Sequence, residues 1–225
     1  MLRQSLTIAA KDLRSELRTK EALNASLAFS IVILVLFSFA FDPGADTIME
    51  FSGGLLWLVY SFAGALVLNR SFAREKDNDC LDALIASPAP AGALFLGKAL
   101  ANFALLMAVE LVSLAAFALF YDVRLSATAF WTILLVMFLA TWAMTVIGTM
   151  FSALTVNLRL RELMLPILVY PFLIPALMAA MLLTTDSMAG MSIWGNDSIW
   201  VRVLVAFDVV FTALAVVFID VVLVG

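Results

Sequence analysis

The segment Arg70–Lys98, RSFAREKDNDCLDALIASPAPAGALFLGK, is the longest polar interruption in a chain otherwise built from apolar runs of about membrane-spanning length. Its charged side chains are Arg70, Arg74, Glu75, Lys76, Asp77, Asp79, Asp82 and Lys98. Its apolar patch and the stop that follows are Leu81, Leu84, Ile85, Pro88 and Pro90. A charged hairpin of this kind between two membrane spans predicts a loop that a soluble partner holds.

The composition requires lipid as a solvent. Of the 225 residues, 64% are hydrophobic and 13% are charged, and the mean hydropathy is +1.10. A soluble domain would carry about twice that charged fraction. We therefore predict an integral membrane protein with a single transmembrane domain over residues 1–225. The chain contains no histidine, which excludes a His-based metal site, haem ligand or proton relay from this chain.

Six apolar runs predict six transmembrane helices in an all-α fold. They cover residues 22–41, 52–69, 99–120, 127–155, 164–185 and 200–223. Each is long enough to cross about 30 Å of hydrocarbon as a helix. The run at 127–155 is longer than one span needs, so we expect part of it to extend beyond the lipid or to bend.

Residues 1–20 are too charged to span a bilayer and predict an amphipathic helix on the membrane surface. Leu2, Leu6, Leu13 and Leu17 recur at helical spacing, whereas most of the charged residues lie off that stripe. A signal peptide would have a shorter charged region and a small-residue cleavage site, and neither pattern is present here.

The basic residues predict the orientation of the spans. Eleven of the thirteen Lys and Arg lie in the N-terminal segment, in the 70–98 segment, or at Arg159 and Arg161. Only Arg124 and Arg202 belong to the opposite side. By the positive-inside rule, both termini and the 70–98 segment should face the cytoplasm.

Two acids within the apolar runs are candidate functional groups. Glu110 lies near the centre of the third run and Asp208 lies in the sixth. A carboxylate at membrane depth costs several kcal/mol by most estimates, roughly 3 on insertion scales, and by default marks function. Glu110 either belongs to a buried network or substrate path, or locks helices together, and the sequence leaves both open.

Two further patterns concern motion and nucleotide binding. Pro171 and Pro175 predict a kinked fifth span and a hinge, because prolines free backbone carbonyls within a helix. Gly92–Lys98 has the outline of a phosphate-binding loop, but Ala99 offers no hydroxyl for magnesium and no buried strand precedes it. We therefore expect ATP and Mg²⁺ on a partner chain, and no enzymatic activity in this one.

The segment between the second and third spans resembles the cytoplasmic signature of the CcmB family, the permease subunits of the ABC transporter for cytochrome c maturation. The resemblance rests on Arg70 and Phe72, on Leu81-Asp82 with Leu84, and on Pro88 and Lys98. The stretch LPILVYPFLIP at 165–175 is similar to that family's fifth span. The length, the six spans and the amphipathic N-terminus fit over essentially the whole chain.

The resemblance implies a type V, ABC-2-like exporter fold and a set of partners. Two copies would pair with two copies of the ATPase subunit CcmA, beside CcmC and CcmD. The complex would couple ATP hydrolysis to release of the haem-loaded periplasmic chaperone CcmE. The resemblance makes haem something the complex handles, and it assigns no cofactor to this chain.

The residue pattern then suggests how the chain acts. The 70–98 segment would dock on the ATPase, with Leu81, Leu84 and Ile85 as the buried anchor, because apolar anchors dominate interface energies. The polar residues of the same docking set are Arg70, Arg74, Glu75 and Asp82. The alternatives are an ABC-2 permease for a lipid, drug or glycan, and a non-transporting scaffold of the maturation complex.

Overall fold

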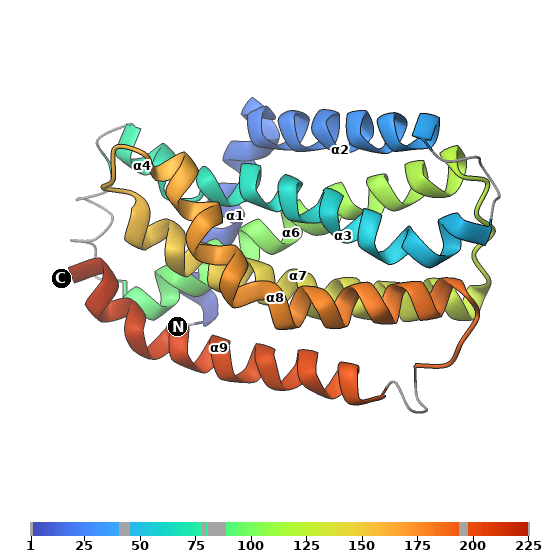
Figure 1. Cartoon of the computed structure of the whole chain (residues 1–225). Coiled ribbons are helices and arrows are strands. Elements are labelled where there is room, and N and C mark those ends of the chain that lie inside the picture. The colour runs from blue at the N-terminus through green and yellow to red at the C-terminus, as the bar shows by residue number, and fades with distance from the viewer. Residues whose placement is uncertain (1, 41–45, 78–79, 81–88, 194–197, 225) are drawn as a thin grey trace.

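The computed structural model describes residues 2–40, 46–77, 80, 89–193 and 198–224, and this part of the chain is a bundle of helices without a strand. Six helices are long and apolar enough to cross a membrane, which confirms the all-helical fold class with six spans. They are α2 (Glu21–Ala40), α3 (Asp46–Asn69), α6 (Ala91–Phe120), α7 (Ala127–Thr155), α8 (Arg161–Met188) and α9 (Ser198–Val224). Two helices, α1 (Leu2–Thr19) and α4 (Ala73–Asp77), lie at one end of this bundle (Figure 1).

The third span begins earlier than the sequence predicted. We expected it at residue 99, because Lys98 is charged, but α6 begins at Ala91 directly after Pro90. Lys98 is 1% exposed in the structure and its ammonium group is paired, so its charge does not end the helix. The final part of the 70–98 segment is therefore helical, including the stretch that resembled a phosphate-binding loop.

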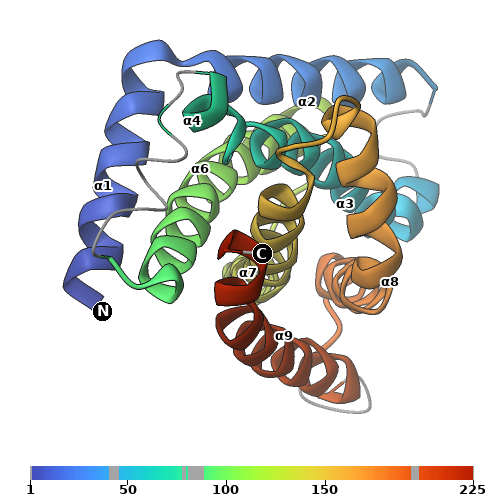
Figure 2. The same ribbon diagram turned by 90° about the vertical axis from the view of Figure 1, so that its left-hand side faces the viewer.

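Helix α1 lies across the end of the bundle, roughly perpendicular to the spans (Figures 1 and 2). Leu2, Leu6 and Leu17 are exposed, as the predicted apolar stripe requires, and Leu13 packs partly against the bundle. The sequence did not reveal a second face of this helix. Ser5 and Glu16 are buried against the bundle, and the close approach to α6 depends on Gly97, where a Cβ would lie 2.8 Å from the Ser5 carbonyl oxygen.

The main hydrophobic core lies among α3, α6, α7 and α8, while α2 and α9 expose much of their surface. Aromatic side chains tie the helices together through their polar tips. Trp57 Nε1 donates to Thr184 Oγ1 at 2.9 Å, and Tyr121 donates its hydroxyl to the Leu34 carbonyl at 2.9 Å. Because lipid tails are as apolar as leucine, such bonds and close packing hold membrane helices together.

Helix α8 contains three prolines and remains helical from Arg161 to Met188. The prolines are Pro166, Pro171 and Pro175. The helix changes direction along its length (Figure 1), as expected where proline removes backbone hydrogen bonds. Whether Pro171 and Pro175 act as a moving hinge stays a prediction.

The contact between α3 and α8 gives a test of the packing. A Cβ on Gly53 would lie 2.2 Å from the backbone oxygen of Met181, whereas a Cβ on Gly54 would meet only the flexible end of the Met181 side chain, at 3.4 Å. Gly53→Ala should lower the free energy of unfolding by about 1–3 kcal/mol, because backbone must move. Gly54→Ala should leave it unchanged or raise it by up to about 1 kcal/mol. Thermal unfolding of both variants in detergent measures the difference, and equal melting temperatures would contradict this packing.

Candidate functional site

A buried ammonium group organises the end of the bundle where both termini lie. Lys98 Nζ donates to Glu75 Oε1 at 2.8 Å, to the Ser71 carbonyl at 2.6 Å and to Asp12 Oδ2 at 3.2 Å. It also lies 4.7 Å from the centre of the Phe72 ring. We call these five residues the Lys98 junction. It joins α1, the turn after α3, α4 and α6.

A second lysine stabilises the acids of this junction. Lys11 Nζ lies 2.9 Å from Asp12 Oδ1 and 3.2 Å from Glu75 Oε1. Burial lowers the pKa of Lys11, but the hydrogen bonds and charges of Asp12 and Glu75 outweigh it and raise the pKa above its ordinary value. The two acids therefore share two cations, which offsets part of the cost of burying them, and Glu75 Oε2 has no hydrogen-bond partner among the described residues.

A neighbouring carboxylate fixes the corner between α1 and α2. Glu16 Oε1 accepts hydrogen bonds from the backbone N–H groups of Ala22 and Leu23, at 2.8 and 3.0 Å, so it caps the first turn of α2. Its other oxygen pairs with Arg74. Arg70 pairs with Glu21 at the start of α2. The 70–77 region is therefore held by both N-terminal helices.

An amide connects the same region to α7. Asn102 Nδ2 donates to Ser71 Oγ and to Thr149 Oγ1, both at 2.9 Å. Lys76 Nζ donates to Asn157 Oδ1 at 2.7 Å, just beyond the end of α7. These contacts attach the region that follows α3 to α6 and to the end of α7.

The structure places four of the predicted docking residues in this network. Phe72 is fully buried and Glu75 is 9% exposed, so in this conformation neither presents a surface to a partner. Arg70 and Arg74 are partly exposed and form ion pairs within the chain. The remaining predicted docking residues lie outside the part that the structure describes: Leu81, Asp82, Leu84, Ile85 and Pro88.

Glu110 is fully buried at mid-helix in α6. Thr141 donates to its Oε2 at 2.6 Å, and the Tyr60 hydroxyl donates to its backbone carbonyl at 3.3 Å. Its Oε1 has no hydrogen-bond partner among the residues described. The carboxyl group thus connects α6 with α7 and lies beside α3.

Asp208 lies on α9 and is 9% exposed. Its Oδ1 is buried and has no hydrogen-bond partner within the described ranges. One turn further along the helix, Thr212 accepts a hydrogen bond from Trp142 Nε1 at 3.0 Å. The structure does not bring Asp208 and Glu110 into a common hydrogen-bonded group.

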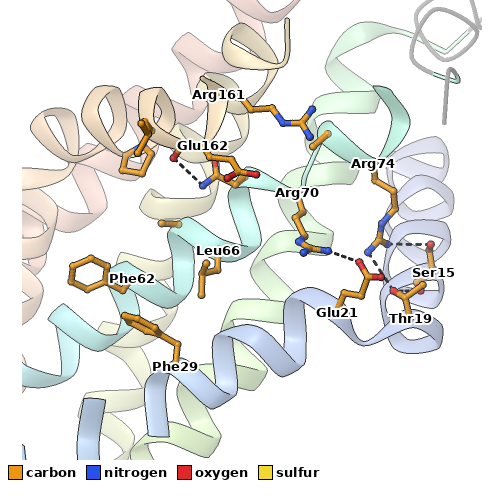
Figure 3. Close-up of a pocket in the computed structure, with 15 residues that line it drawn as sticks. Ser15, Thr19, Glu21, Phe29, Phe62, Leu66, Arg70, Arg74, Arg161 and Glu162 are labelled. Carbon is orange, nitrogen blue, oxygen red and sulfur yellow. Dashed lines mark hydrogen bonds and ion pairs between the residues drawn. The ribbon is translucent and has the colours of Figure 1, made fainter. Parts of the chain in front are cut away.

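A groove of about 890 Å³ lies beside the Lys98 junction. Its floor is α3, its sides are α2 and the start of α8, and α1 and α4 close one end. Figure 3 shows Arg70, Arg74 and Arg161 at the charged end, with Phe29 and Phe62 at the apolar end. The rings of Phe29 and Phe62 are 5.6 Å apart. The groove thus combines cations with an aromatic wall.

Comparison with known proteins identifies the family. The family model described as CcmB protein matches residues 3–221. Heme exporter protein B of Rhodobacter capsulatus is 30% identical over 186 residues, covering 83% of this chain and 84% of that protein. Heme exporter protein B of Pseudomonas aeruginosa is 28% identical over 210 residues, covering 93% and 92%. The chain belongs to the CcmB family.

Membership in the CcmB family confirms that the chain is a membrane permease subunit of an ABC transporter for cytochrome c maturation. The ATPase of such a transporter is a separate chain, CcmA. The named relatives are bacterial, and the six candidate spans make the chain a multi-pass membrane protein.

Sequence reasoning missed several residues of the network around the Lys98 junction. Lys98 was expected only to end the loop, and Asp12, Glu16 and Asn102 were not singled out. One signal could have found two of these residues, Asp12 and Glu16. Glu16, Asp12 and Ser5 fall on one side of a helix of 3.6-residue period, next to the leucine stripe, which predicts a polar face that needs a partner.

The junction predicts a large loss of stability on removal of its central charge. Lys98→Met keeps the length and apolar stem of the side chain but leaves Glu75 and Asp12 with fewer cations. We expect the free energy of unfolding to fall by about 3–5 kcal/mol, as for other broken buried ion pairs. Denaturation in mixed micelles measures this loss.

The matched control is Lys20→Met, at an exposed position where no ion pair is formed in the described part of the chain. That change should stay within about 0.5 kcal/mol of wild type. If Lys98→Met were no more destabilising than Lys20→Met, the junction would not hold these helices together.

Proposed function

We propose that this CcmB-family chain receives ATP-driven movement of CcmA at its 70–98 segment and transmits it along α6 into the membrane core. In the assembled transporter, this movement would drive haem handling and release of the haem-loaded chaperone CcmE on the other side of the membrane. The observation that supports this role is the course of α6, which carries both the Lys98 junction and Glu110.

The length of α6 makes it suitable as a lever. It is continuous from Ala91 to Phe120. Lys98 and Glu110 are twelve residues apart, which is about 18 Å along a helix axis. Because Lys98 is bound to α1, α4 and the turn after α3, a displacement of the loop base must move α6 as well. Glu110 would then pass the displacement to α7 through Thr141.

The proposed docking surface leaves out those residues of the 70–98 segment that are buried within the chain. Phe72 and Glu75 are buried and would position the segment. The contact with CcmA would then fall to the apolar residues Leu81, Leu84 and Ile85, with Asp82 and Pro88 shaping the same surface. Apolar anchors of this kind supply most of the energy of a protein interface, whereas charges at its rim supply little.

The orientation and the partners belong to the same proposal. Both termini and α4 lie at one end of the bundle (Figure 1), and the basic residues of the 70–77 region support a cytoplasmic location for that end. We infer two copies of this chain with two of CcmA, beside CcmC and CcmD. Docking of a cytoplasmic ATPase on the 70–98 segment requires this orientation. The Leu84→Asp experiment below therefore tests the docking surface and the orientation together.

We propose that the bent helix α8 is the part of the bundle that changes shape. Pro171 and Pro175 lie within it, and each removes a backbone hydrogen bond that would otherwise stiffen the helix. A displacement of α6 reaches α8 through α7, which packs against both. We propose that α8 changes its bend as the transporter cycles.

A single substitution tests the docking surface. Leu84→Asp should abolish co-purification with CcmA, because a charge replaces a buried anchor, while membrane insertion stays normal. Met191→Asp is the matched control, since Met191 is 53% exposed beyond the far end of α8. Normal recovery of CcmA with Leu84→Asp would contradict the proposed surface and remove one support for the cytoplasmic location of this end.

Haem staining of CcmE in cells that lack the chain tests the function itself. We expect CcmE with covalently bound haem to accumulate, mature cytochrome c to disappear, and a wild-type copy to reverse both effects. Absence of haem on CcmE would instead place the chain at haem delivery. Normal cytochrome c would contradict the proposal and favour another transported substrate.

A further inference from the structure

The groove between α2 and α8 has the features of a lipid site. We propose that it binds one anionic phospholipid, with the phosphate on Arg70 and Arg161 and an acyl chain along Phe29 and Phe62. The proposal goes beyond the coupling role and does not depend on it, because it concerns binding alone.

The depth of the groove in the membrane fits a phospholipid. Helix α1 closes its charged end, and this helix exposes leucines that must enter the lipid, so it marks the boundary between headgroups and acyl chains. Arg70 therefore lies at headgroup level. Phe62 comes eight residues earlier along α3, about 12 Å deeper into the hydrocarbon. One molecule with a charged head and an apolar tail matches both ends.

The guanidinium donors of the groove can hold an anion. Three arginines line it with Glu21 and Glu162, and one of the three, Arg74, is already paired with Glu16. Arg70 uses one terminal nitrogen for its pair with Glu21. A guanidinium group has five N–H donors arranged in a fork that matches phosphate, so donors of Arg70 remain for a second anion. Arg161 is half-buried across the groove at the start of α8 (Figure 3).

The apolar end favours an acyl chain. Phe62 is 48% exposed, and Leu66 and Leu163 also line the groove with exposed side chains. Ala65 lies on the floor between the charged and aromatic ends. Its small side chain leaves space that a bulkier residue would fill. One acyl chain of the phospholipid lying in this space would cover the rings of Phe29 and Phe62.

Native mass spectrometry of the purified full chain tests the proposal, with phosphatidylglycerol and phosphatidylcholine titrated in parallel. Wild type should bind phosphatidylglycerol more tightly. An arginine near an anionic headgroup is worth about fivefold in affinity, so Arg70→Gln with Arg161→Gln should weaken phosphatidylglycerol binding about 25-fold. The matched control, Arg124→Gln with Arg202→Gln, removes the same charge from exposed positions of the opposite side and should leave affinity unchanged.

A second variant guards against a general effect of the arginine changes on folding. Ala65→Trp keeps every charge and fills the groove, so it should abolish tight binding of phosphatidylglycerol while the melting temperature stays near that of wild type. Wild-type affinity in both the arginine and Ala65→Trp variants would overturn the proposal. An equal loss of phosphatidylglycerol affinity in the control pair would also overturn it. Displacement of the lipid by stoichiometric ferric protoporphyrin would overturn it too, and would assign the groove to a tetrapyrrole.

Discussion

The ion cluster around Lys98 is the constraint on which the charged end of the bundle depends. A buried ammonium group is tolerated only where anions and acceptors surround it. Here they come from α1, α4 and the turn after α3, so these segments cannot move away from α6 without exposing an unpaired charge. The same constraint explains why α6 is a 30-residue helix that continues past a lysine.

The proposed docking role divides one segment into two parts. Phe72 and Glu75, the residues nearest the spans, are buried and fix the base of the 70–98 segment, and we propose that its apolar patch binds the partner. A permease that must respond to an external ATPase needs a rigid base, since a loose one would absorb the displacement. The hydrogen bonds and ion pairs of the Lys98 junction supply that rigidity. A permease subunit of the CcmB family needs it in order to respond to its ATPase.

Much of the fold followed from the sequence because lipid imposes simple rules. Apolar length predicted the six spans, and the leucine stripe predicted that α1 would expose an apolar face. The exact start of α6 did not follow, because the partners of Lys98 lie up to 86 residues away in sequence. Glu16 was missed as the cap of α2 for a different reason, because its partners Ala22 and Leu23 are close in sequence but are reached only where the chain turns the corner between α1 and α2. Glu110 was found, since a carboxyl group in an apolar run is conspicuous, but its bond to Thr141 required the three-dimensional packing of α6 on α7.

The most direct test of the central claim is a distance measurement between the segment and α6 during the ATPase cycle. Spin labels on the native Cys80, which is exposed, and on an introduced Ala115→Cys would report it in the assembled transporter. If the Lys98 junction fixes the segment to α6, the mean distance stays the same with and without ATP, and it changes when Lys98→Met is added. A distance that shifts with ATP in the otherwise wild-type chain would show that the segment moves independently of α6 and would contradict the account.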